Sequence, residues 1–361
     1  MKKLKLLRIV GARPQFMQVK PLRKELQKRG HKEILLHTGQ HYDDAMSKQF
    51  FIDLGLPEAD VNLGVGSGNH GEQTARMLEG IEKCLLHDKY DAVIVDGDTN
   101  STLAGALAAT KLHIPVIHVE AGMRSYNKLM PEEINRTLTD HVSTLLFCPS
   151  ERNKENLHRE GITHGVYVVG DVFAECFSEY KTKALELQNQ TLSRYRIEKE
   201  KYILLTLHRA ENVDNKEKIS YFLNEVSKSP LPVVWPIHPR TKRLLEEFGL
   251  TSKLNEKVFK LISPVGYLEM LALESSAFKI LTDSGGVQRE AYYWRKPSVI
   301  MRDTTEWTEI VDSNWATLFD IHDPSSKLWG MPAISESEAK DLYKYKGVSA
   351  EIVRIIEEAL L

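Results

Sequence analysis

Short apolar runs alternate with helical patterns along nearly the whole chain. The runs cover residues 4–10, 34–38, 92–96, 114–117, 145–148 and 166–169 in the first half, and 202–206, 233–236, 258–262, 279–282 and 298–301 in the second. Runs of this length, bounded by turn residues and separated by helical segments such as 44–54 and 71–86, are typical of buried parallel strands with crossover helices. The pattern predicts an α/β protein with two doubly wound, Rossmann-like domains.

The alternation of apolar runs and helical segments also suggests where the domain boundary lies. We place the first domain at residues 1–169 and the second at 170–346, with Gly170, Asp171 and the helix after them as the bridge. Residues 188–201 are polar and are interpreted as a surface excursion. The last helix, 347–361, has no strand after it, and we expect it to pack back onto the first domain. Two such sheets that face each other form a cleft, which is a usual place for a ligand.

Composition excludes several classes of protein. A chain of 361 residues suits two domains, and a formal charge of −2 gives no argument for binding nucleic acid or an anionic membrane. Cys84, Cys148 and Cys176 have no paired spacing, so we expect buried thiols without a disulfide framework or a metal site. No stretch approaches the roughly 20 apolar residues of a membrane span. We expect a soluble, cytoplasmic protein.

Acidic side chains follow two strands of the first half. Glu120 comes just after the strand at 114–117, and Glu132 and Glu133 stand in the first turn of a helix that Pro131 opens. Ordinary helix-start charge explains Glu132 and Glu133 equally well, but it does not explain Glu120. Asp98 follows the strand at 92–96, where capping by Thr99–Thr102 accounts for only part of the segment. Ligands bind at the carboxyl ends of strands in such sheets, so these side chains are candidates for chemistry.

A third turn of the first half carries a cation. Arg13 lies in the Gly-Ala-Arg-Pro turn at 11–14, after the first strand. Its guanidinium suits a phosphate or a carboxylate, although a surface cation is an equally good interpretation.

The second half carries basic and anion-binding turns. His208 and Arg209 follow its first strand and suit proton transfer or phosphate contact, and His238 and Arg240 follow its second. The Ser-Gly-Gly sequence at 284–286 opens a helix after the strand at 279–282, and such a helix start binds anions.

The acidic side chain of Glu290, one turn into that helix, fits sugar hydroxyls better than phosphate. A plain helix start remains an alternative for Ser-Gly-Gly. Together the two halves favour a nucleotide sugar, with the nucleotide on the second domain and the sugar against the carboxylates of the first.

Motifs in order along the chain resemble those of the non-hydrolysing UDP-N-acetylglucosamine 2-epimerases. They lie at 11–14, 97–99, 118–124, 131–136, 208–209, 238–239, 283–290 and 302–306. The resemblance implies the two-domain fold of the GT-B glycosyltransferases with the active site in the cleft, UDP near Arg13, His238, Ser284, Gly285, Gly286 and Glu290, and acid–base roles for Asp98, Glu120, Glu132 and His208. It also implies a homodimer without a metal or another cofactor.

The mechanism that the resemblance implies is elimination and re-addition. A base removes the proton on carbon 2 of the sugar, UDP leaves carbon 1, and UDP returns after a proton reaches the opposite face. Proton traffic on two faces needs at least two acid–base groups. We add Arg136, Arg209, Arg240 and Arg302 to the substrate-binding set.

The sequence departs from the family pattern at two places. Gln18 stands where many members carry a lysine, and residues 38–43 differ from the segment of members that their own substrate activates. The latter segment, with 97–102 and 305–307, is closer to the branch that acts on UDP-2,3-diacetamido-2,3-dideoxyglucuronate. Because a glucuronate carries an extra carboxylate, that substrate would need a further cation. Arg124, Lys128 and Arg302 are candidates.

Three other functions share much of this evidence. A GT-B glycosyltransferase would bind a UDP-sugar but would leave the carboxylates of the first domain surplus. A hydrolysing 2-epimerase usually has a different first turn, and a catalytically inactive binding protein would not need intact Asp98, Glu120, Glu132 and His208.

Overall fold

The computed structural model describes residues 2–39, 55, 58–323, 325–329 and 341–361. The helix expected at 44–54 and most of the segment at 38–43 lie outside these residues. Two compact units are present, one made of residues 1–179 and 341–361 and the other of residues 180–340. The first unit thus continues beyond the predicted boundary at residue 169.

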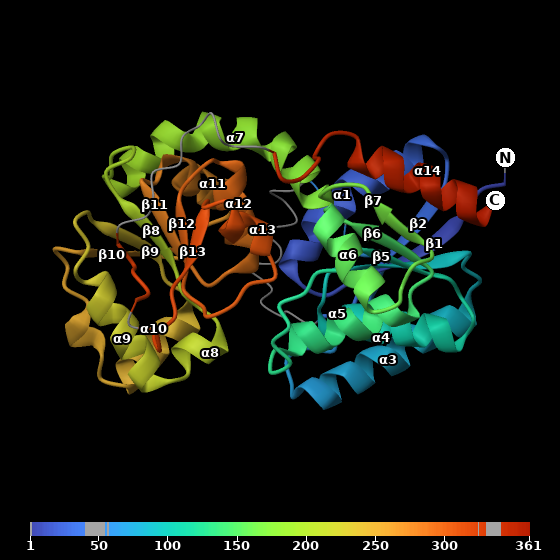
Figure 1. Ribbon diagram of the computed structural model, residues 1–361, viewed down its shortest axis with the longest axis horizontal. Helices are drawn as coiled ribbons and strands as arrows, with labels where there is room; N and C mark the ends of the chain where they lie inside the picture. Colours follow the sequence, from blue (N-terminus) through green and yellow to red (C-terminus); the bar gives the residue numbers. More distant parts are fainter. Residues whose placement is uncertain (1, 40–54, 56–57, 324, 330–340) are drawn as a thin grey trace. The chain divides into compact units, whose positions relative to one another are not determined.

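Unit 1 is a parallel sheet covered by helices on both faces (Figure 1). Its strands lie in the order β3-β2-β1-β4-β5-β6-β7. Their bounds are Lys5–Val10 (β1), Lys32–His37 (β2), Val61–Asn62 (β3), Ala92–Asp96 (β4), Val116–Val119 (β5), Leu145–Cys148 (β6) and Val166–Val168 (β7). The helices of this unit are Arg13–Lys28 (α1), His70–His87 (α3), Asn100–Lys111 (α4), Pro131–Val142 (α5), Glu151–Arg159 (α6) and Val348–Leu360 (α14).

Successive side chains of the central strands point to opposite faces of the sheet, so unit 1 has a hydrophobic core on each face. Leu6 and Ile94 face one side, where they meet α1 and α14, while Leu7 and Val93 face the other side, where they meet α3 and α4. The C-terminal helix α14 lies beside α1 and buries Ile352 and Ile356 there, as predicted (Figure 1). Its Glu357 also pairs with Arg29, at 2.7 Å.

Unit 2 repeats the architecture with strand order β10-β9-β8-β11-β12-β13. Its strands are Ile203–Thr206 (β8), Val233–Pro236 (β9), Phe259–Ile262 (β10), Lys279–Thr282 (β11), Ser298–Ile300 (β12) and Ala316–Leu318 (β13). Its helices are Ala210–Val213 (α8), Lys216–Val226 (α9), Pro239–Glu247 (α10), Tyr267–Ser276 (α11), Gly285–Tyr293 (α12) and Thr308–Asp312 (α13). The two parallel sheets confirm the predicted fold class.

Three elements differ from the sequence prediction. Helix α7 runs from Val172 to Tyr195, so the polar residues 188–195 continue a helix instead of forming an excursion. The short edge strands β3 and β13 were not predicted, because runs of two or three residues carry too little apolar pattern to stand out.

Candidate functional site

The acidic turns of unit 1 follow neighbouring strands. β1, β4 and β5 are adjacent and parallel, so the turns after them lie along one edge of the sheet. This edge carries Asp98 after β4 and Glu120 after β5. The turn after β1 leads into α1 at Arg13, whose side chain lies outside the part of the chain that the structure describes.

Gln15 on α1 joins the first two turns. Its Oε1 accepts hydrogen bonds from the backbone N–H groups of Gly11 and Ala12, at 2.7 and 2.9 Å. Its Nε2 donates to the carbonyl of Asp96 at 2.7 Å and to Thr102 Oγ1 at 3.1 Å. One buried amide therefore fixes the backbone of the turns after β1 and β4, a role that no sequence pattern indicates.

Asp98 is held by Arg136, a member of the predicted substrate-binding set. The Nε of Arg136 donates to Asp98 Oδ2 at 3.1 Å, its Nη2 approaches the same oxygen, and its Nη1 donates to Glu133 Oε2 at 2.8 Å. Arg136 is 1% exposed, whereas 27% of the Asp98 side chain is exposed. The buried guanidinium of Arg136 thus orients the partly exposed carboxylate of Asp98.

Glu133 secures the loop before α5. Its carboxylate accepts from the backbone N–H groups of Ser125 and Tyr126, at 2.9 and 2.8 Å, and from Arg136. Of the two adjacent glutamates, Glu133 is therefore buried in structural contacts. Glu132 is half-buried in the first turn of α5.

Glu120 has an unusual backbone. Its φ is +72°, in the left-handed region that a residue with a side chain seldom adopts, and its N–H donates to the carbonyl of Phe147 at 3.1 Å. The side chain of Gln18, from α1, donates through Nε2 to Glu120 Oε2. Backbone conformations of this kind cluster at functional sites.

A buried ion pair supports both acidic turns. His118 Nδ1 lies 2.7 Å from Asp140 Oδ1, and His118 Nε2 lies 2.8 Å from the carbonyl of Gly97. Both ring nitrogens face acceptors, so the doubly protonated imidazolium satisfies both. Asp140 also accepts from the N–H of Gly122, at 3.2 Å. The pair therefore holds the turn before Asp98 and the turn after Glu120.

The electrostatics of this pair follow from its burial and its charges. Burial lowers the pKa of His118, but the Asp140 carboxylate outweighs burial and leaves that pKa raised. Burial raises the pKa of Asp140, but His118 and Arg124 outweigh it and leave that pKa lowered. Each shift therefore favours the charged form of its group.

Arg124 belongs to the same network. Its Nε and Nη2 donate to the two carboxylate oxygens of Glu160, at 2.8 and 2.6 Å, and its Nη1 donates to Asp140 at 2.7 Å. The guanidinium is 2% exposed, so its donors are committed within the fold. Of the cations considered for a substrate carboxylate, Lys128 is exposed in the loop before α5.

In unit 2, Asp283 shapes the turn that carries His208 and Arg209. This buried carboxylate accepts from the backbone N–H groups of His208 and Arg209, at 3.0 and 2.9 Å, and from Asn212 Nδ2 at 3.1 Å. His208 Nδ1 also lies 3.2 Å from Asp283 Oδ1, with 48% of the His208 side chain exposed. Asp283 thus aims His208 outward from the carboxyl end of β8.

The amino end of α12 is a candidate site for an anion. Ser284 is its N-cap and accepts from the N–H of Val287, which leaves the N–H groups of Gly285 and Gly286 without a partner among the described residues. A Cβ at position 285 would lie 2.9 Å from Glu306 Oε1, so glycine fits there. Exposed N–H groups and the helix dipole suit a phosphate.

The side chain of Glu290, in the same helix, is buried in unit 2. It is 5% exposed, and Glu274 on α11 beside it is 0% exposed. Burial raises the pKa of Glu290, and burial together with the nearby Glu290 raises the pKa of Glu274 well above its ordinary value. Burial of two carboxyls near each other disfavours a state in which both are charged.

The other basic residues proposed for unit 2 differ in exposure. His238 is exposed at the N-cap of α10, and Arg240 beside it pairs with Asp214 at 2.6 Å. Arg302 is 2% exposed and lies 3.3 Å from Glu306 and 3.5 Å from Glu211.

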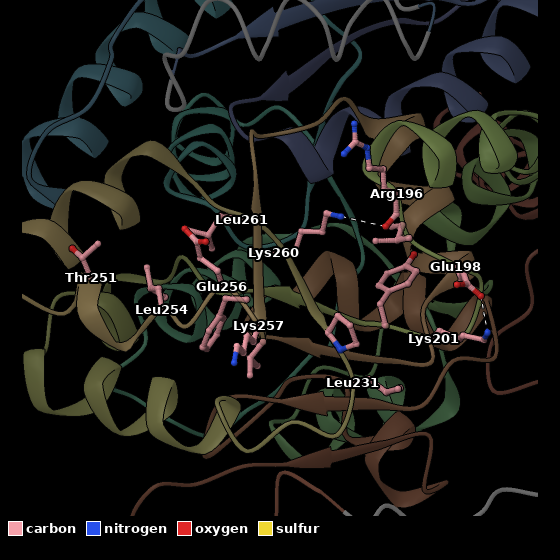
Figure 2. A pocket seen from close by; sticks show the side chains of 15 residues that line it. Arg196, Glu198, Lys201, Leu231, Thr251, Leu254, Glu256, Lys257, Lys260 and Leu261 are labelled. Atoms are coloured by element: carbon pink, nitrogen blue, oxygen red, sulfur yellow. Dashed lines mark hydrogen bonds and ion pairs between the residues drawn. The ribbon is translucent and has the colours of Figure 1, made fainter.

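A hollow of about 910 Å³ lies at the opposite edge of the unit 2 sheet, near the amino ends of β8, β9 and β10 (Figure 2). Lys257 and Lys260 line it, and Lys260 Nζ donates to the carbonyl of Arg196 at 3.2 Å. It contains none of the predicted site residues.

Two structural features are absent from the described residues. No helix among them is both long and apolar enough to cross a membrane. No group of three or more histidine, cysteine or acidic side chains among them is arranged to hold a metal ion.

Comparison with known proteins shows which family the sequence resembles. The sequence model of a family described as UDP-N-acetylglucosamine 2-epimerase matches residues 24–357. A UDP-N-acetylglucosamine 2-epimerase homolog of Methanococcus maripaludis is 48% identical over 98% of this chain and 99% of its own length. The UDP-2,3-diacetamido-2,3-dideoxy-D-glucuronate 2-epimerase of Pseudomonas aeruginosa is 47% identical over 85% and 86%.

A solved structure extends the likeness to three dimensions. The UDP-GlcNAc 2-epimerase of Methanocaldococcus jannaschii, in complex with UDP-GlcNAc and UDP, superimposes with a TM-score of 0.86. It is 42% identical in sequence, and the match covers 98% of this chain and 100% of that one.

Proposed function

The chain belongs to the UDP-N-acetylglucosamine 2-epimerase family, and from this premise we propose that it inverts carbon 2 of a UDP-N-acetylhexosamine without releasing UDP to water. The observation that carries the proposal is the pair of carboxylates, Asp98 and Glu120, at adjacent strand ends of unit 1. Each has a dedicated buried partner, Arg136 for Asp98 and Gln18 for Glu120.

Inversion of carbon 2 needs proton transfer on two faces of the ring. Asp98, Glu120 and Glu132, together with His208 of unit 2, are the acid–base groups of the proposal. A carboxylate takes the proton from carbon 2 while UDP leaves carbon 1, and an acid returns a proton to the opposite face before UDP adds again. Positioned acid–base groups contribute about 10²- to 10⁴-fold each to such steps.

Departure of UDP needs stabilisation of the charge on the diphosphate. The N–H groups of Gly285 and Gly286 at the amino end of α12 are the proposed donors, with Arg13 and Arg209 as cations. Glu290 is proposed to accept hydrogen bonds from the ribose. His238, Arg240 and Arg302 complete the proposed nucleotide-binding set.

The contacts of the arginines favour UDP-N-acetylglucosamine as the substrate. A glucuronate-type sugar carries an extra carboxylate, whereas Arg124 and Arg302 are buried among carboxylates of the chain itself. UDP-2,3-diacetamido-2,3-dideoxyglucuronate is the second candidate, because the Pseudomonas relative is 47% identical and Lys128 is exposed before α5.

Assembly and location are further parts of the proposal. We expect a homodimer in the cytoplasm. Leu129, Ile134 and Leu138 are 92%, 49% and 46% exposed on or before α5, and we propose them as candidates for the contact between subunits. Light scattering should give about twice the chain mass of 41.2 kDa, and a mass of one chain would contradict the dimer.

Exchange in deuterated water tests the function. The protein is incubated with each of the two UDP-sugars separately, and carbon 2 and the phosphates are followed by NMR. An epimerase incorporates deuterium at carbon 2 and keeps UDP attached. Accumulation of free UDP would instead identify a hydrolase, and a carbon 2 that stays protonated would identify a transferase or a binding protein.

A further inference from the structure

Among the described residues, only one of the two polar ends of the Gln18 side chain has a hydrogen-bond partner. It is 3% exposed on α1, and its Nε2 donates to Glu120. Its Oε1 is buried and accepts no hydrogen bond from any described residue. A buried carbonyl without a donor costs about 1–3 kcal/mol, so such atoms are rare unless they have a use.

The position of Gln18 Oε1 limits which substrate groups could donate a hydrogen bond to it. Within the proposed function, Glu120 acts on the hydrogen of carbon 2. The side-chain amide that touches Glu120 therefore lies near the groups bonded to carbon 2. The nearest hydrogen-bond donor on an N-acetylhexosamine is the N–H of the acetamido group on that same carbon, so its chemistry matches the Gln18 carbonyl.

We infer that Gln18 is a specificity-determining residue whose Oε1 accepts a hydrogen bond from the acetamido N–H on carbon 2, while its Nε2 positions Glu120. This inference rests on the proposed function. One planar amide would then set the direction of the carboxylate and of the substituent beside the reacting carbon. An ammonium group at this position could serve Glu120 but could not accept from the substrate.

Two substitutions can therefore test the donor and the acceptor of the Gln18 amide separately. Gln18→Lys keeps a donor for Glu120 and removes the acceptor, whereas Gln18→Met removes both. With UDP-N-acetylglucosamine, Gln18→Lys should raise KM roughly five- to twentyfold, the size of one hydrogen bond, with kcat within about threefold. Gln18→Met should raise KM similarly and also lower kcat, because Glu120 loses its donor.

Two controls keep a structural effect apart from a substrate contact. UDP alone has no acetamido group, so its inhibition constant should stay within about twofold in both variants. Gln27→Lys makes the same exchange on the exposed side of α1 and should leave KM and kcat unchanged. Melting temperatures show whether Gln18→Lys folds, and Gln18→Met carries the test if it does not.

An unchanged KM in a folded Gln18→Lys or in Gln18→Met would overturn the inference. So would a rise in KM that is matched by an equal loss of UDP affinity, because the lost contact would not then be to the sugar. In either case wild-type exchange at carbon 2 would persist, so the proposed function would stand. Absence of that exchange in the wild type would instead remove the proposed function.

Discussion

Replacement of Asp140 by asparagine should destabilise the protein far more than its conservative shape suggests. Asp140 is 1% exposed and accepts from His118 and Arg124, each at 2.7 Å, and from the N–H of Gly122. The asparagine amide preserves the volume but removes the charge that balances two buried cations. The imidazolium must then lose its proton, and Arg124 keeps only Glu160 as a charged partner.

The size of the effect follows from the burial of the pair. Removal of one partner of a buried ion pair costs about 3–5 kcal/mol. Asparagine retains one oxygen acceptor, so the lower end, about 3 kcal/mol, is expected. Asp140 lies in unit 1, and in a unit of about 150–250 residues 1 kcal/mol moves the melting temperature by about 2–4 °C, which gives an expected loss of roughly 6–12 °C for the transition of unit 1.

The pH dependence supplies a second check. The raised pKa of His118 means that its stabilisation is fully present below the ordinary histidine pKa, about 6.5, and is lost as pH rises through the raised value. The lowered pKa of Asp140 means that its stabilisation is present above the ordinary carboxyl pKa and is lost as pH falls through the lowered value. The gap between wild type and variant should therefore be large at pH 6 and should narrow in alkali.

Calorimetry of three proteins would measure how much the charge of Asp140 stabilises the fold. The wild type, Asp140→Asn and Glu72→Gln are melted at pH 6 and again at pH 9. Glu72 forms an exposed pair with Arg76 on α3, so the same carboxylate-to-amide change there should cost less than about 1 kcal/mol. If Asp140→Asn melted within 2 °C of the wild type at pH 6, the charged network would not be the support described here.

Two further variants probe the other buried charges. Arg136→Met removes the donors to Asp98 and Glu133, so kcat should fall at least about tenfold with a lower melting temperature, and activity assays that showed an unchanged kcat would contradict the positioning role. Glu274→Gln should melt increasingly above the wild type as pH rises from 5 to 8. The raised pKa of Glu274 makes the folded wild type bind more protons than the unfolded chain, so its stability falls with pH, and a constant difference in melting temperature would refute this.

The location of the acidic site could be predicted from the sequence because it depends on topology alone. Asp98 and Glu120 each follow an apolar run, and in a doubly wound parallel sheet such positions share one edge. The helix starts at Pro131 and Ser284 were also readable, since capping and first-turn preferences are local. The structure adds that β4 and β5 are neighbours, which local patterns do not specify.

The partners of these residues could not be predicted, because they come from distant parts of the chain. Arg136 was expected to bind substrate, yet it holds Asp98, 38 residues away. Gln18 meets Glu120 across 102 residues. An isolated arginine or glutamine carries no sequence pattern that distinguishes a ligand contact from a buried pair, so only the packing of helix on sheet reveals the difference.

The central claim is that carboxylates at the ends of β4 and β5 move the proton on carbon 2. Its most direct test is the rate of deuterium uptake at that carbon in Asp98→Asn and Glu120→Gln, each shown by its melting curve to be folded and by titration to bind UDP. We expect uptake to fall at least about a hundredfold in both variants, as for loss of a positioned acid–base group. Uptake within threefold of the wild type in both would contradict the account.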